Sequence, residues 1–171
     1  FSSSSGTMYQ NVHVSKLLDG QVTKSSIISE FNSLSSKIQP DDVFVFYLAG
    51  HGTMYNGDYY FIPVDFKARN EKQIPDYGVS KDFFMDNLSK IKAQKSLIMF
   101  DTCNSGTFVE QMAFDRFAHT TGQAIIAASS DVQSALEGYK GHGVFTYAVL
   151  DGLGGKADIM RNGTVSVSGL S

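Results

Sequence analysis

The chain has very little cysteine: Cys103 is the single one among 171 residues. One cysteine cannot form an internal disulfide, so we expect a free thiol, a reducing compartment and a cytoplasmic location. No apolar run reaches the ~18 residues that a membrane span needs. The opening residues, FSSSSGTMYQ, lack the basic segment followed by an apolar one that marks a signal peptide. A net charge of −3 gives no reason to expect nucleic acid or an anionic membrane as partner.

The size and composition are those of an ordinary globular domain. The chain is 42% hydrophobic and 18% charged, and 171 residues are enough for a substantial core. We find no internal repeat and no long linker, so we expect one domain over residues 1–171.

Strand patterns alternate with helix patterns along the chain. Apolar stretches without polar alternation predict strands buried on both faces at 42–50, 96–102 and 123–130. Shorter strands are expected at 12–18 and 57–65, and helices at 23–38 (capped by Thr23), from Ser80 onward, and at 143–155. This alternation predicts an α/β domain with a mostly parallel sheet flanked by helices.

A polar cluster follows each of the three predicted buried strands. These clusters read AGHG, DTCNSG and SSD. In parallel sheets the carboxyl ends of the strands meet at one edge, where ligands bind. We therefore expect His51, Asp101, Cys103 and Asp131 to lie close together, although they are far apart in sequence.

A thiol beside an imidazole favours nucleophilic catalysis. The imidazole can take the thiol proton and so generate the thiolate nucleophile. Gly52 and Gly106 let the backbone approach a substrate and leave N–H groups available for an oxyanion. His142 competes with His51 for the role of base, but His51 follows a predicted buried strand and is preferred. His13 and His119 lie in polar surroundings and are expected at the surface.

Metal chemistry finds little support in the residue spacing. One cysteine and four scattered histidines do not match a zinc site. Residues 157–169 resemble a calcium loop faintly, with Asp158, Asn162 and Gly163 in suitable positions. Met160 stands at a ligand position and Gly169 where the closing Glu belongs, so we predict a plain turn and no cofactor.

Two paired motifs carry a family resemblance. DVFVFYLAGHG followed by SLIMFDTCNSG resembles the caspase-like cysteine peptidases, and within them the prokaryotic metacaspase-like group. The later stretch from Ala124 to Leu153 resembles the same group, so the resemblance covers roughly residues 12–168. It implies a caspase-like three-layer sandwich. It also implies a nucleophile at Cys103, an acid/base at His51 and an oxyanion hole of the Gly52 and Cys103 N–H groups.

The resemblance also implies a substrate class, a protein or peptide. In animal caspases the position that matches Asp101 resembles a glutamine, and the specificity pocket accepts aspartate. An acid there predicts a pocket for Arg or Lys at P1, with Asp131 as a second acid, and Glu137 is expected at the surface. The alternatives are a pocket for Asp or Asn, a catalytically silent module that binds peptides, or another amide hydrolase or transpeptidase on the same fold.

Two departures from the family pattern affect the expected organisation. The fold of these peptidases normally opens with a strand and a helix before the region matching residues 12–18, and neither is found here. Relatives also continue beyond the final VSVSGLS. We therefore expect a piece of a larger protein, with a missing segment or a regulatory domain as partner. Calcium activation, known among such peptidases, has no clear site in this sequence.

Overall fold

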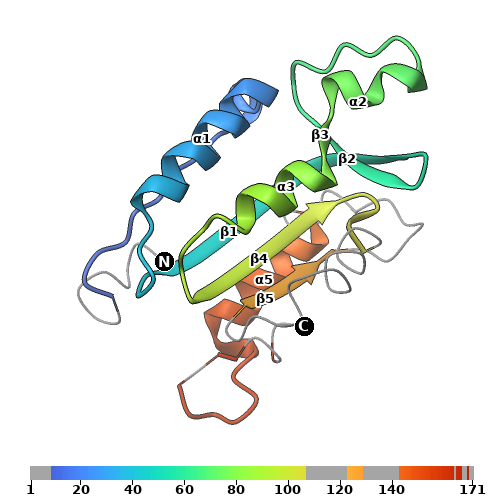
Figure 1. The fold of residues 1–171 in the computed structure, drawn as a ribbon. Coiled ribbons are helices and arrows are strands. Elements are labelled where there is room, and N and C mark those ends of the chain that lie inside the picture. Colours follow the sequence, from blue (N-terminus) through green and yellow to red (C-terminus); the bar gives the residue numbers. More distant parts are fainter. Residues whose placement is uncertain (1–8, 107–122, 129–142, 164, 167–168, 170–171) are drawn as a thin grey trace.

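A mixed β-sheet forms the centre of the molecule (Figure 1). The computed structural model describes residues 9–106, 123–128, 143–163, 165–166 and 169. Within these residues the sheet has five strands in the order β3-β2-β1-β4-β5. Their bounds are β1 Val43–Tyr55, β2 Asp58–Ile62, β3 Val79–Ser80, β4 Lys95–Thr102 and β5 Gln123–Ala127.

The sheet is parallel in one half and antiparallel in the other. β1 pairs with β4, and β4 with β5, in parallel register. β1 also pairs with β2, and β2 with β3, in antiparallel register. The predicted α/β fold is therefore confirmed, with the parallel pairing confined to β1, β4 and β5.

Two amphipathic helices cover one face of the sheet. α1 (Lys24–Lys37) begins after Thr23, whose side chain accepts the N–H of Ser26, and α3 (Lys81–Leu88) begins after Ser80 in the same way. Both caps were predicted. The helices bury a large aromatic core against the even-numbered residues of β1 and β4. Its members include Ile27, Phe31, Phe44, Phe61, Phe84, Leu88, Ile98 and Phe100.

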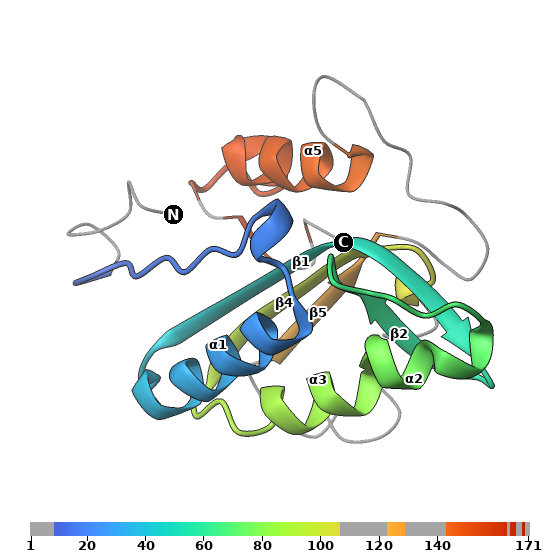
Figure 2. The same ribbon diagram turned by 90° about the horizontal axis from the view of Figure 1, so that it is seen from above.

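A third helix, α5 (Val144–Asp151), covers the opposite face, and Figure 2 shows the sheet between the two helical layers. Val149 of α5 packs with Met99 of β4 and Ile126 of β5. The helix continues into a wider turn over Gly152–Lys156, where Gly155 has a φ of 114°. The odd-numbered residues of β1 and β4 therefore face α5, because strand side chains alternate between faces.

Three sequence predictions need correction. Residues 12–18 form no strand, because Val14 and Leu18 are 54% and 61% exposed and no neighbouring strand pairs with them. β1 does not end at residue 50 but continues to Tyr55 with β2 as its new partner. It is also only partly buried on the α5 face, where Val43 and Tyr47 are exposed.

The short helix α2 (Ile74–Tyr77) and the strand β3 were not predicted. Both are four residues or fewer, too short to leave a periodic pattern. No helix in the described part of the chain is long and apolar enough to cross a bilayer.

Candidate active site

His51 and Cys103 follow directly after the last residues that pair β1 with β4. The parallel pairing of β1 with β4 ends at Gly50 opposite Thr102, and His51 and Cys103 are the next residues on each side. Neighbouring strands are about 4.8 Å apart, so their backbones are in contact distance at this point. His51 continues the odd-numbered series of β1 that faces α5, and Cys103, the first residue after β4, is a half-buried free thiol.

His51 stands where β1 changes partners. Gly50 pairs with β4, while His51 already pairs with Ile62 of β2. Gly50 has a φ of 148°, and a Cβ added there would lie 2.9 Å from the ring of Phe61. Only glycine therefore fits at this bend in the strand. The sequence placed His51 just beyond a strand, whereas the structure places it within one.

Gly52 brings the histidine strand against the backbone of Cys103. A Cβ added to Gly52 would lie 2.6 Å from the carbonyl oxygen of Cys103 and 2.6 Å from Cε2 of Tyr59. No real Cβ sits that close, so the contact requires glycine. Gly52 and the carbonyl of Cys103 are thus packed together, while the predicted oxyanion hole of the two N–H groups stays a prediction.

A buried hydrogen bond supports the end of β4 from the α3 side. The hydroxyls of Tyr59 and Thr102 are 2.7 Å apart, and neither residue is exposed. Burial raises the pKa of Tyr59, so the ring stays neutral at any ordinary pH. The backbone that carries Cys103 is therefore held on the side opposite to α5.

The chain turns sharply directly after Cys103. Asn104 has a φ of 60°, a conformation that asparagine tolerates better than most residues. Ser105 is fully buried, and its hydroxyl has no hydrogen-bond partner among the described residues. The turn leaves Cys103 partly exposed at the sheet edge.

Asp101 is buried beneath α5, two residues before Cys103. It is 8% exposed, and its Oδ2 accepts hydrogen bonds from Thr146 Oγ1 (2.7 Å) and from the Tyr47 hydroxyl (3.0 Å). Oδ1 has no hydrogen-bond partner among the described residues. Burial, with the nearby Asp101 charge in a smaller part, raises the pKa of Tyr47 to about 12, so this phenol remains a donor.

Tyr47 and Thr146 were missed by the sequence analysis. They lie 54 and 45 residues from Asp101, in a strand and a helix whose patterns only indicate burial. The alternation of Tyr47 with His51 on one strand face is the only signal that connects them with the site.

Several predicted site residues cannot be placed. Asp131, Glu137, His119 and the competing His142 lie outside the described residues. The weak calcium pattern behaves as a turn. Both carboxylate oxygens of Asp158 accept backbone N–H groups, from Asn162 at 3.1 Å and Gly163 at 2.7 Å. No group of metal-binding side chains occurs within the part of the chain that the structure describes.

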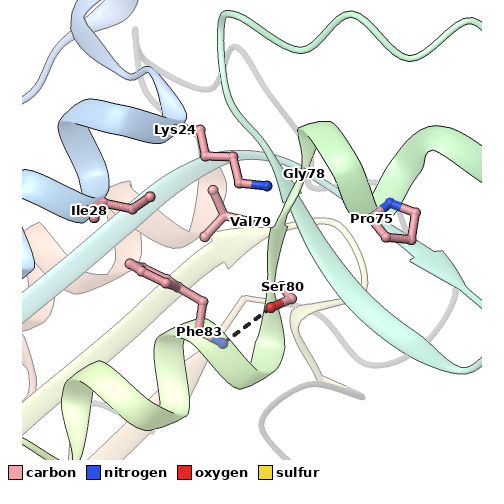
Figure 3. Close-up of a pocket in the computed structure, with 7 residues that line it drawn as sticks. All are labelled: Lys24, Ile28, Pro75, Gly78, Val79, Ser80 and Phe83. Carbon is pink, nitrogen blue, oxygen red and sulfur yellow. Dashed lines mark hydrogen bonds between the residues drawn. The ribbon is translucent and has the colours of Figure 1, made fainter.

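A pocket between α1, α2 and α3 lies away from His51 and Cys103 (Figure 3). Its polar groups already have partners: Lys24 Nζ donates to the carbonyl of Asp76, and Ser80 Oγ accepts the N–H of Phe83. It sits on the aromatic-core face, opposite to Asp101. We therefore assign the candidate site to the edge formed by His51 and Cys103.

Comparison with known sequences identifies the family of the chain. No curated protein matches the chain significantly. The sequence profile of the caspase domain matches residues 7–165, which is nearly the whole chain and includes His51, Asp101 and Cys103. Together with the sheet order and the helical layers, this match shows that the chain belongs to the caspase-domain family of cysteine peptidases.

Proposed function

We propose that this protein is a cysteine endopeptidase that cleaves peptide bonds after Arg and Lys with a His51/Cys103 dyad. The observation that carries the proposal is the pairing of β1 with β4. This pairing ends at Gly50 opposite Thr102, so His51 and Cys103 are the residues that follow directly on the two chains, and Gly52 is packed against the Cys103 carbonyl. A structural role would not require an exposed histidine beside a half-buried thiol at this edge.

The reaction needs only groups of this chain and water. His51 takes the proton of the Cys103 thiol, and the thiolate attacks the carbonyl carbon of the scissile bond. The resulting oxyanion would be held by the N–H groups of Gly52 and Cys103. His51 then gives its proton to the leaving amine as the C–N bond breaks, and water hydrolyses the thioester.

Asp101 supplies the preference for a basic residue. It lies on β4, two residues before Cys103, and its side chain is directed at α5, where it contacts Thr146. Its Oδ2 accepts hydrogen bonds from Tyr47 and Thr146, which fixes the carboxylate. In this proposal Oδ1, which has no hydrogen-bond partner among the described residues, meets the cation of the substrate. A guanidinium can meet a carboxylate with two parallel hydrogen bonds, so Arg should be preferred over Lys.

The finer assignments follow from the same site. The proposed preference for a basic residue at P1 assigns the protein to the metacaspase-like group of the family. A second acid at Asp131 remains part of the proposal. The chemistry requires no cofactor, and the single free thiol favours a reducing compartment such as the cytoplasm.

The test is a set of fluorogenic peptides that differ only in P1, with Arg, Lys, Asn or Asp. We expect the wild type to favour Arg, and Asp101→Asn to lose about ten- to a hundredfold in kcat/KM on Arg, the range of one charged hydrogen bond. Asp58→Asn, which changes an exposed carboxylate of β2, is the matched control.

Three results would count against the proposal. Preference for Asp or Asn would overturn the pocket assignment. Unchanged Arg cleavage by Asp101→Asn would remove Asp101 from it. Binding of the peptides without cleavage of any would favour the catalytically silent module.

A further inference from the structure

A second pocket adjoins His51 on the side away from Cys103. Its volume is about 330 Å³. It is formed by the ends of β1 and β2 and by the segment that leads from β2 to α2. The lining residues are Thr53, Ile62, Phe66, Ala68, Arg69, Asn70, Glu71 and Ile74.

Strand register fixes where this pocket lies relative to the dyad. Ile62 is the direct antiparallel partner of His51, so the two side chains share one face, with Cβ atoms about 5 Å apart. Thr53 follows His51 by two residues and lies on that face as well. In the sheet, β4 with Cys103 is on one side of β1, and β2 with Ile62 is on the other. His51 therefore lies between Cys103 and the pocket.

The wall of the pocket is a built structure. The backbone N–H of Arg69 donates to Oε1 of Gln73 at 2.8 Å and closes the loop. The ring of Phe66 packs edge-on against Tyr77, with centroids 6.4 Å apart. Ile74 is only 9% exposed. These contacts hold the lining segment in place in the absence of a ligand.

The path of the leaving peptide segment indicates what this pocket binds. In the proposed mechanism His51 protonates the leaving amine, so the segment after the scissile bond must leave Cys103 on the His51 side. An extended peptide advances about 3.3 Å per residue, so its first two residues span the distance from His51 to Ile62 and beyond.

We propose that this pocket binds a large apolar side chain, such as Leu or Phe, at one of the first two positions after the scissile bond. Ile62, Phe66 and Ile74 give it apolar walls. Arg69 and Glu71 at its exposed rim carry opposite charges, which gives no preference for a charged side chain of either sign. This inference rests on the proposed function, since it uses His51 as the general acid.

The experiment compares internally quenched peptides with a fixed Arg at P1 and Leu, Phe, Ala, Asp or Lys at each of the next two positions. An arginyl aminocoumarin substrate, which has no residue after the scissile bond, is measured in parallel. We expect Leu or Phe at one position to raise kcat/KM at least about tenfold over Ala, as for an apolar group in a fitting pocket.

A pocket-filling variant checks that the preference arises here. Ala68→Phe should reduce the ratio of kcat/KM for the Leu peptide to that for the Ala peptide toward one. Val64→Phe adds the same ring at a position that is 58% exposed and outside the pocket, and should keep the ratio.

The possible results distinguish failure of the pocket proposal from failure of the proposed peptidase activity. Cleavage of the aminocoumarin substrate with no preference after the scissile bond would overturn the pocket assignment alone. A preference for Asp or Lys there, or a ratio unaffected by Ala68→Phe, would also overturn it. No cleavage of any substrate would overturn both proposals.

Discussion

Gly52→Ala tests the contact that joins the histidine strand to the cysteine. The new methyl would lie 2.6 Å from the Cys103 carbonyl oxygen and 2.8 Å from the Tyr59 hydroxyl. Carbon and oxygen atoms normally approach to about 3.3 Å, so one of these groups must move by about 0.7 Å. Tyr59 is fully buried and bonded to Thr102, so we expect the backbone of Cys103 to shift.

The shift translates into a measurable loss of activity. Misplacing a reacting group by 1 Å costs about a hundredfold, so a shift of this size should lower kcat/KM on an arginyl peptide by about ten- to thirtyfold. Overpacking of this kind also costs about 1–3 kcal/mol of stability. At about 2–4 °C per kcal/mol for a chain of this size, Tm should fall by several degrees.

The matched control is Gly154→Ala, because a Cβ added at Gly154 meets no atom within 4 Å. Its activity and Tm should equal those of the wild type. If Gly52→Ala also behaves like the wild type in both measurements, the close packing of Gly52 on Cys103 is wrong. The reasoning that joins His51 to Cys103 through it then fails.

Three further predictions concern stability and ionisation. Phe84→Ala should lower the free energy of unfolding by about 3–5 kcal/mol in urea titrations, since the ring is 0% exposed and fully within the aromatic core, and a loss under 1 kcal/mol would contradict that. Tyr59→Phe leaves the buried Thr102 hydroxyl without this bond and should cost about 1–3 kcal/mol, whereas an unchanged urea midpoint would argue against the bond. Tyr47 has its pKa raised in the folded state, so its stabilising effect is complete below pH 10 and is lost as pH rises through about 12. The phenolate absorbance that Tyr47→Phe removes should therefore titrate near pH 12, and a step near pH 10 would disagree.

The strands and helices that were predicted correctly share a clear local signal. Thr23 and Ser80 cap helices with regular apolar spacing, and both caps are present. The apolar runs of β1 and β4 are long enough to identify as strands without a partner in view. The expectation at residues 12–18 failed because alternation alone cannot show whether a neighbouring strand exists, and Val14 and Leu18 meet none.

The candidate site was predictable only where it follows from strand order. His51, Asp101 and Cys103 could be brought together because parallel strands share an edge. The supporting hydroxyls of Tyr47 and Thr146 could not, since their contacts with Asp101 depend on how α5 docks on the sheet. The continuation of β1 past Gly50, which pairs His51 with Ile62, was hidden by glycines that are typical of a loop.

The most direct test of the central claim is hydrolysis of an arginyl fluorogenic peptide by Cys103→Ala, His51→Ala and His142→Ala beside the wild type. We expect Cys103→Ala to lose several orders of magnitude in kcat/KM while keeping its Tm, because the covalent nucleophile is gone. His51→Ala should lose nearly as much, since the dyad acts as a unit, and His142→Ala far less. Cleavage by Cys103→Ala at the wild-type rate would contradict the assignment of this protein as a cysteine peptidase.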